Sequence, residues 1–253
     1  MKKGRNLLRS VLNGVGLLKV GNFHVFKKEF RKRVSSETLS LGLKRNLKTP
    51  FQNPDAKIPI SVRKLQPVDI ESLFKDREFI DSNYRLVNNQ LSLVDANLPT
   101  CYVAIDKNGS AGYMQWLIGP QYNSKIQSIF NGIFPVLNDD EALLEAAFMS
   151  PAFRGLGIMP AAMSRIAEKA KKLNVSRVIT FVGIDNIPSL KGCHRAGFSP
   201  YVLRKDKWTL FRQNVTFHPI SEYILTSYHR EITGTELKSI HSDHKSVKPV
   251  IHE

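Results

Sequence analysis

The sequence is poor in cysteine and has no long apolar run. Its 253 residues include only two cysteines, Cys101 and Cys193. Two cysteines are too few for a disulfide framework or, on their own, for a zinc cluster, so a reducing, intracellular setting is the simpler interpretation. No run of about 18 apolar residues occurs, which argues against a transmembrane helix. The hydrophobic content of 42% is ordinary for a soluble protein with a core.

Acidic residues are scarce at the N-terminal end. Residues 1–64 contain 16 lysines and arginines but only Glu29, Glu37 and Asp55, and they carry most of the formal net charge of +15. The rest of the chain is nearly balanced. This asymmetry predicts an anionic partner, either membrane lipid or nucleic acid, for the N-terminal segment.

A cationic amphipathic helix is predicted within residues 1–20. Leucines and valines recur there at three- and four-residue spacing, between lysines and arginines. The helix would lie either on a membrane surface or on its own domain. A secretory signal is not favoured, because Asn13 breaks the apolar stretch and no small-residue cleavage site follows. We therefore expect a peripheral membrane contact through residues 1–33 as one option, and do not favour nucleic acid, for which no recognised motif is present.

Three regions are expected along the chain. Residues 1–59 are predicted to form a basic N-terminal extension, with a short strand at residues 23–26 and a polar, proline-punctuated linker at residues 35–59. Residues 60–212 are predicted to form the folded domain. Residues 213–253 are predicted to form a polar tail, whose scattered histidines indicate no metal site.

The middle region has a mixed α/β pattern. Strands are predicted at residues 60–65, 101–105, 112–118, 142–149, 178–182, 201–203 and 208–211, and helices at residues 68–74, 79–93, 125–130, 160–172 and 189–196. Asn108-Gly109 marks a hairpin turn between two of the strands. Pro67 suits the first turn of the helix that follows it.

The segment between the strand at residues 142–149 and the helix at residues 160–172 is the most informative. It reads SPAFRGLGIMP over residues 150–160. Glycines allow a tight turn and leave backbone amides uncovered, and a helix N-terminus behind them favours phosphate. The dinucleotide fingerprint fails because Pro160 stands where it needs glycine, and no Gly-Lys-Ser/Thr ending supports a Walker motif.

This segment resembles the signature of the GNAT family of N-acetyltransferases. That signature is an Arg or Gln, two residues, Gly, one residue, and then Gly or Ala, and Arg154 and Gly157 fit its first two fixed positions. Downstream, Asn186, Ser189 and the pair Gly197-Phe198 resemble a second motif of the family. The resemblance covers residues 60–212 and implies a mixed, mostly antiparallel central sheet flanked by helices, here with a basic N-terminal extension.

The resemblance also implies an activity. It points to an acyl-CoA-dependent N-acyltransferase of the cytoplasm, which transfers acetyl from acetyl-CoA, or another acyl group from its acyl-CoA, directly to the amine of a small molecule without a metal. The alternative is a non-catalytic, GNAT-like binding module recruited to an anionic membrane or nucleic-acid surface.

The resemblance further implies where the coenzyme would bind. The pantetheine arm would lie along a backbone strand, the diphosphate in the glycine turn, and two polar side chains beside the pantetheine. In that order, the implied residues are Ala147, Phe148 and Met149; Arg154, Gly155, Leu156, Gly157, Ile158 and Met159; and Asn186 and Ser189.

The catalytic assignments are less direct. The family often has a tyrosine seven residues after the motif asparagine, acting as an acid toward the leaving thiolate, and this chain has Cys193 there. A thiol has a proton to donate, although a buried cysteine commonly acts as a small apolar filler. Strand alternation places Glu145 on the same face as Ala147 and Met149, which makes it the candidate base. A structural role for Glu145 is the alternative. Met159 departs from the Gly or Ala that ends the first motif.

Overall fold

The computed structural model describes residues 30–96, 98 and 100–234. The predicted amphipathic helix at residues 1–20, the strand at residues 23–26 and the histidines of the last residues lie outside the described residues. A helical segment at residues 30–34 leads into the first described strand.

Eight strands form one sheet in the order β2-β3-β4-β5-β6-β1-β7-β8. Neighbouring strands are antiparallel except for β5 and β6, which are parallel. The strands are β1 (Ser35–Asn46), β2 (Ser61–Lys64), β3 (Cys101–Ile105), β4 (Ala111–Ile118), β5 (Glu141–Met149), β6 (Arg177–Gly183), β7 (Ser199–Thr209) and β8 (Arg212–His218). The predicted mixed, mostly antiparallel sheet is confirmed.

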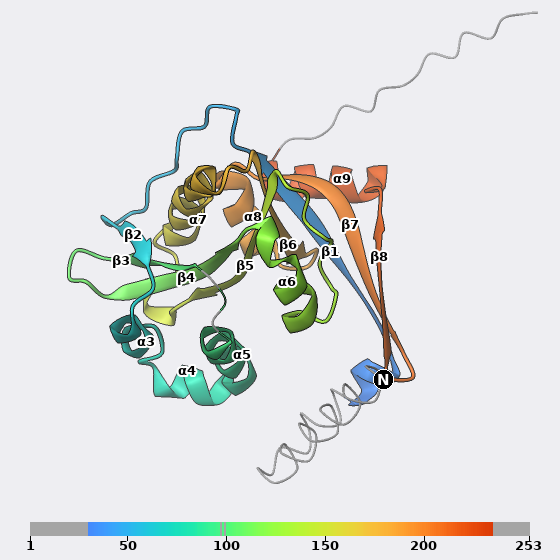
Figure 1. Ribbon diagram of the computed structural model, residues 1–253, viewed down its shortest axis with the longest axis horizontal. Coiled ribbons are helices and arrows are strands. Elements are labelled where there is room, and N and C mark those ends of the chain that lie inside the picture. The colour runs from blue at the N-terminus through green and yellow to red at the C-terminus, as the bar shows by residue number, and fades with distance from the viewer. Residues whose placement is uncertain (1–29, 97, 99, 235–253) are drawn as a thin grey trace, which may run out of the picture.

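Helices cover both faces of the sheet (Figure 1). One face carries α7 (Ile158–Lys169), α8 (Ile187–Arg195) and α9 (Glu222–Tyr228), and the other carries α3 (Pro67–Leu73), α4 (Arg77–Ser82), α5 (Tyr84–Asp95) and α6 (Asn123–Ile129). Two apolar layers result. Met163 and Ile166 of α7 lie in the first layer, and Leu73 of α3 and Trp116 of β4 lie in the second.

The start of α3 shows how the sequence sets an element boundary. Pro67 occupies the first turn, as predicted, where its missing N–H costs no helical hydrogen bond. The Asp69 carboxylate accepts from the Gln66 backbone N–H at 2.7 Å and from both terminal nitrogens of Arg63 at 2.6 Å. The buried Asp69 therefore joins the helix start to β2.

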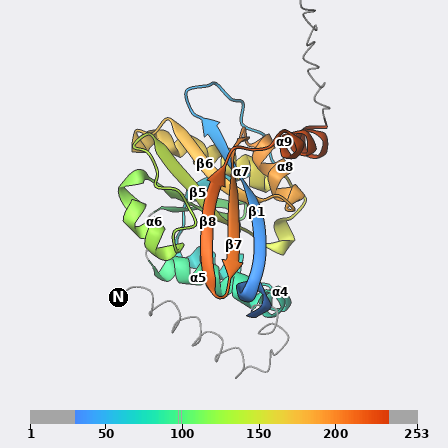
Figure 2. The same cartoon turned by 90° about the vertical axis from the view of Figure 1, so that its right-hand side faces the viewer.

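The linker predicted at residues 35–59 is wrong over β1. This strand lies between β6 and β7 and pairs with both, from Ser40 to Asn46 on one edge and along nearly its whole length on the other. Figure 2 shows β1 and β7 side by side. Leu41 and Leu43 are almost fully buried, so residues before the expected domain boundary form the middle of the sheet.

The predictions at the C-terminal end also need correction. The last hairpin was expected between residues 201–203 and 208–211, but β7 runs unbroken to Thr209 and turns at Leu210-Phe211 into β8. Residues 213–218 are therefore part of the sheet. The polar tail is helical at α9, which packs on the first layer through Tyr228.

Two further searches of the described part of the chain are negative. No helix there combines the length and apolar character needed to cross a membrane. No group of three or more histidine, cysteine, aspartate or glutamate side chains there is arranged to hold a metal ion.

Arg45 ties β1 to the helices above it. It is 3% exposed, and its Nη1 donates to Ser164 Oγ at 2.6 Å and to the Ala196 carbonyl at 3.1 Å. Its Nη2 lies 2.7 Å from Glu168 Oε1.

We predict that Arg45→Ala lowers the free energy of unfolding by about 3 kcal/mol, because it leaves buried acceptors unpaired and removes one of the two ion pairs of Glu168, whose other partner is Lys171. Urea denaturation measures this value. Lys48→Ala is the matched control, since Lys48 is exposed, and it should change the unfolding free energy by less than about 0.5 kcal/mol. Equal effects of the two substitutions would contradict the role given to Arg45.

Candidate active site

β5 and β6 part after a short stretch of pairing. Their parallel register begins at Glu141 and Arg177 and ends at Leu143 and Ile179. Beyond this point β5 pairs only with β4, and β6 only with β1. The facing backbone edges of the two strands therefore have no strand partner within the described residues, and can hydrogen-bond an extended ligand between them.

A β-bulge interrupts β5 beside this opening. Trp116 lies opposite Glu145 and Met114 lies opposite Phe148, so a step of three residues on β5 matches a step of two on β4. Ala146, within the bulge, has a positive φ of 55°. A bulge of this kind changes which face the following side chains occupy.

The predicted face of Glu145 is wrong because of this bulge. Alternation placed Glu145 with Ala147 and Met149. Residues directly opposite each other share a face of the sheet, so Glu145 lies on the Trp116 side, in the second layer, whereas Met149 packs against the first. One extra residue in the pairing of two strands cannot be recognised from the pattern of hydrophobic residues, so the sequence could not predict this change of face.

Glu145 has an unusual electrostatic environment. Its side chain is half-buried, and loss of solvent raises its pKa to about 7. A hydrogen bond with the Ala146 backbone and the positive charge of Arg204 both act in the opposite direction. A carboxyl with a pKa near neutrality is able both to accept and to release a proton at pH 7.

The glycine turn follows β5, as predicted. A short 3-10 helix, η2 (Pro151–Phe153), leads into it, and α7 begins at Ile158 with Gly157 as its N-cap. Gly155 and Gly157 have φ values of 73° and 70°, in the left-handed region that glycine adopts without strain. Gly155 is exposed, and a Cβ there would meet no atom within 4 Å, so this side of the turn is open.

The amides at the start of α7 are available to a ligand. In the part of the chain that the structure describes, nothing accepts a hydrogen bond from the N–H of Gly157, Ile158 or Met159. Pro160, the third helical residue, has no N–H to offer. Three bare donors and the positive end of the helix dipole form a site for an anionic group.

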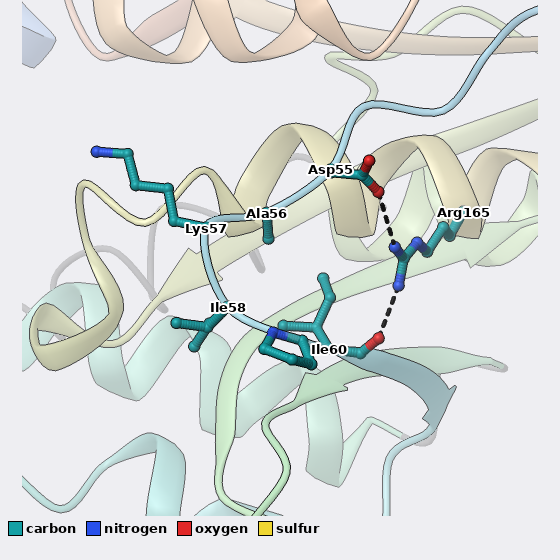
Figure 3. A pocket seen from close by; sticks show the side chains of 7 residues that line it. Asp55, Ala56, Lys57, Ile58, Ile60 and Arg165 are labelled. Atoms are coloured by element: carbon teal, nitrogen blue, oxygen red, sulfur yellow. Dashed lines mark hydrogen bonds and ion pairs between the residues drawn. The ribbon is translucent and has the colours of Figure 1, made fainter.

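Residues 55–60, which we call the strap, cross the other side of the turn (Figure 3). The Lys57 N–H donates to the Leu156 carbonyl at 2.8 Å. A Cβ on Gly157 would lie 3.7 Å from the Ala56 Cα. The strap therefore packs directly on the glycine turn, although it lies about a hundred residues away in the sequence.

The strap is also attached to the flank of α7. Arg165 Nη1 donates to the Ile60 carbonyl at 2.7 Å, and Arg165 Nη2 lies 3.9 Å from Asp55 Oδ1. The strap and Arg165 line a cavity of about 360 Å³ (Figure 3). In that view Lys57 points away from Arg165, so its ammonium lies apart from the ion pair between Arg165 and Asp55.

Three cationic residues belong to the turn or contact it. Arg195 Nη2 would lie 3.9 Å from a Cβ on Gly157, and Lys57 is exposed next to its hydrogen bond with Leu156. The guanidinium of Arg154, also exposed, lies 5.1 Å from the centre of the Phe79 ring. The local charge therefore favours the same ligand as the bare amides do.

Asn186 lies at the start of α8, three residues beyond the end of β6. Its Oδ1 accepts from the Ser189 N–H at 3.2 Å and caps the helix. The side chain is exposed. Capping uses one of the two acceptor positions of the oxygen, and the amide nitrogen has both of its hydrogens to donate to a ligand.

Comparison with known families settles the identity of the domain. Residues 66–198, more than half of the chain, match the Acetyltransferase (GNAT) family. The chain belongs to the GNAT acetyltransferase family. The predicted resemblance is thereby confirmed, and the strap and β1 lie outside the matched residues.

Solved structures of GNAT proteins are among those that match this chain. An acetyltransferase of the GNAT family from Colwellia psychrerythraea is 15% identical over 79% of this chain, with a TM-score of 0.47. An N-acetyltransferase of this family from Sphaerobacter thermophilus is 13% identical over 72% of this chain, with a TM-score of 0.42. This chain covers 62% and 56% of the two proteins. A comparison with curated proteins finds no match.

The residues of this GNAT domain fit a coenzyme A ligand. Three unpartnered amides, an open Gly155 and nearby cations suit its diphosphate, and the parted backbone edges of β5 and β6 suit its extended arm. Met159, the departure from the family motif, does not close the turn. Its Sδ packs toward α8, where a Cβ on Gly192 would meet it at 2.8 Å.

Cys193 is packed as a core residue. It is 1% exposed, and its thiol lies 3.7 Å from Met163 Sδ. Burial, with a smaller effect of the Glu145 charge, raises the pKa of the thiol to about 12. These contacts are those of an apolar filler between α7 and α8.

Two tyrosines accompany this region. Tyr113 on β4 is 1% exposed, and its hydroxyl donates to Gln115 Oε1 at 2.8 Å. Tyr228 of α9 was missed because its segment was assigned to the tail. Its buried hydroxyl has no hydrogen-bond partner in the described residues, and burial raises its pKa to about 12, with Cys193 as the second cause. Ser221 as a helix cap, followed by Ile224 and Tyr228 four residues apart, is the signal that could have revealed α9.

We predict a pH-dependent stability difference between the wild type and Glu145→Gln. The Glu145 carboxyl binds its proton more tightly in the folded state, with a pKa of about 7 against an ordinary value of 4.5. The wild-type unfolding free energy should therefore fall relative to the variant between pH 5 and 7, by about 2 to 3 kcal/mol. Urea denaturation across this pH range measures the difference, and parallel curves would show that the carboxyl is not buried as described.

Proposed function

We propose that this GNAT protein transfers an acetyl group from acetyl-CoA to the amine of a small molecule. The observation that carries the proposal is the continuity of the site. The unpaired backbone edge of β5 leads directly into a glycine turn with bare amides at the N-terminus of α7. An extended arm that ends in a diphosphate matches this order of groups.

The chain binds the coenzyme mainly through its backbone in this proposal. Ala147, Phe148 and Met149 lie beyond the point where β5 leaves β6, so their main-chain groups hold the pantetheine arm as an added strand would. Gly157, Ile158 and Met159 donate to the diphosphate. Asn186 and Ser189 lie at the start of α8, near the end of β6, and contact the arm from that side.

Acetyl-CoA supplies an activated thioester carbonyl when it is bound. The neutral acceptor amine attacks that carbonyl, the C–S bond breaks and coenzyme A leaves as a thiolate, so the proton that the attacking nitrogen loses must be taken up. Glu145 is the proposed acceptor of that proton, because it lies at the bulge of β5 just beyond the point where β5 leaves β6, and its pKa of about 7 suits a proton acceptor at neutral pH. No step is assigned to Cys193, whose contacts are those of the core.

Binding and turnover experiments test the proposal separately. Isothermal titration with coenzyme A should show saturable binding, and free-thiol release from acetyl-CoA with a panel of small amines should show turnover. Absence of binding at millimolar coenzyme A would contradict the proposal. Binding without thiol release for any amine would favour the alternative of a non-catalytic module.

We predict that Lys57→Ala weakens coenzyme A binding roughly threefold to tenfold, because it removes a cation beside the diphosphate turn. Binding of pantetheine, which has no diphosphate, should not change. Lys48→Ala is the control from the same basic segment. Unchanged coenzyme A affinity would exclude Lys57 from the site, and tighter binding would mean that the strap obstructs the turn.

We predict that Glu145→Gln lowers kcat about 100-fold or more, as expected for loss of a general base. The Kd for coenzyme A should stay within about twofold of the wild-type value, because the base contacts the acceptor side. The wild-type rate should fall on the acid side of pH 7, and the variant should lack this dependence. A variant that keeps the wild-type pH profile would show that another group takes up the proton.

A further inference from the structure

The hairpin between β7 and β8 turns on two residues that are unusual for a tight turn. Thr209 pairs with Arg212, so Leu210 and Phe211 form a two-residue loop. Their φ values are 47° and 64°, both left-handed. Loops of this kind strongly favour Asn-Gly, because side chains larger than those of glycine and asparagine are disfavoured at positive φ. The turn therefore holds two large apolar side chains in a conformation that does not suit them.

These side chains face solvent. Leu210 is 71% exposed and Phe211 is 40% exposed. Phe30, which is 48% exposed, lies with its ring centroid 5.2 Å from that of Phe211. Three large apolar side chains thus share one exposed site at the end of the sheet.

Cations surround this apolar site. Arg31, Lys32, Lys207 and Arg212 are exposed, and the Arg33 guanidinium lies 5.6 Å from the centre of the Trp208 ring. We call these cations, together with Phe30, Leu210 and Phe211, the tip surface.

Among the described residues, the two acidic ones near the tip surface add little opposing charge. Glu37 has an ion pair with Lys205 at 2.7 Å, and Asp206 is buried beside Arg204. The charge that the tip surface presents to solvent is therefore positive.

Hydrogen bonds fix the two parts of the tip surface to each other. The Leu210 N–H donates to the Val34 carbonyl at 2.9 Å, and the Phe211 N–H donates to the Arg33 carbonyl at 2.8 Å. The turn and the basic segment before β1 therefore present their apolar and cationic side chains as one unit.

The tip surface also projects from the body of the protein. β1 pairs with the end of β6 at Ser40 and continues to Ser35, opposite Thr209. Five residues of extended chain correspond to roughly 17 Å. The strands of the hairpin visibly run beyond β6 (Figures 1 and 2), and they do so from the end of β6 that leads to Asn186.

We propose that the tip surface docks on an anionic lipid bilayer. Leu210, Phe211 and Phe30 enter the boundary between head groups and acyl chains, while the surrounding cations contact lipid phosphates and carboxylates. Nucleic acid fits less well, because the most exposed side chain is an aliphatic leucine, which offers neither a stacking plane nor a hydrogen bond to a base. This inference does not depend on acyltransferase activity.

The double substitution Leu210→Asn, Phe211→Gly tests the proposal without harming the fold. It installs the residue pair that the turn geometry prefers, so the unfolding free energy should stay equal or rise. The full chain should sediment with vesicles of phosphatidylcholine containing about one-third phosphatidylserine, and the double variant should lose at least about tenfold in partitioning. Binding to pure phosphatidylcholine should be weak for both proteins.

A matched control is available at the other end of the hairpin. Tyr223 is 82% exposed on α9, beyond the far end of β8, so Tyr223→Ser should leave vesicle binding unchanged. The proposal is overturned if the double variant binds vesicles as the wild type does, whichever segment is then responsible. It is equally overturned if the wild type binds DNA but not the anionic vesicles at the same salt concentration.

Discussion

The hydrogen bonds that β1 makes to β6 on one edge and to β7 on the other hold the halves of the sheet together. β6 meets β5 over only three residue pairs, so without β1 the β7–β8 hairpin would have no strand connection to the rest. β6 stays in the sheet through its pairing with β1 from Arg177 to Gly183, and its other edge is open where β5 departs. The candidate coenzyme site therefore depends on a strand that lies outside the family match.

Two backbone irregularities place the chemistry within this sheet. The bulge at Ala146 transfers Glu145 to the face of Trp116, away from Met149, and the left-handed glycines turn the chain so that α7 begins with bare amides. The Glu145 side chain thus lies on one face of β5, whereas the amides of the anion site lie beyond its C-terminal end, at the start of α7. Under the proposed function, this separation would let an acceptor and a coenzyme approach the opening of β5 and β6 without competing for the same contacts.

The sequence predicted the elements that short-range signals specify. Pro67 marked α3, the strands around Asn108-Gly109 paired as expected, and the SPAFRGLGIMP segment was correctly placed between a strand and a helix. β1 was missed because its burial comes from partners more than a hundred residues away. The bulge was missed because an extra residue in the ladder leaves no trace in composition, and the last turn was misplaced because Leu210-Phe211 lacks the glycine that such turns usually contain.

The position of β1 has a consequence for how the chain is made. Its partners, β6 and β7, are at residues 177–209, so β1 waits for most of the domain to emerge from a ribosome before it can pair. Contacts so distant in sequence slow folding, and a waiting strand exposes unpaired edges in the meantime. During synthesis the basic charge around β1 would keep such nascent chains apart by mutual repulsion, and a polypeptide cut after the last family motif would carry β1 and β6 but no β7 to complete the sheet.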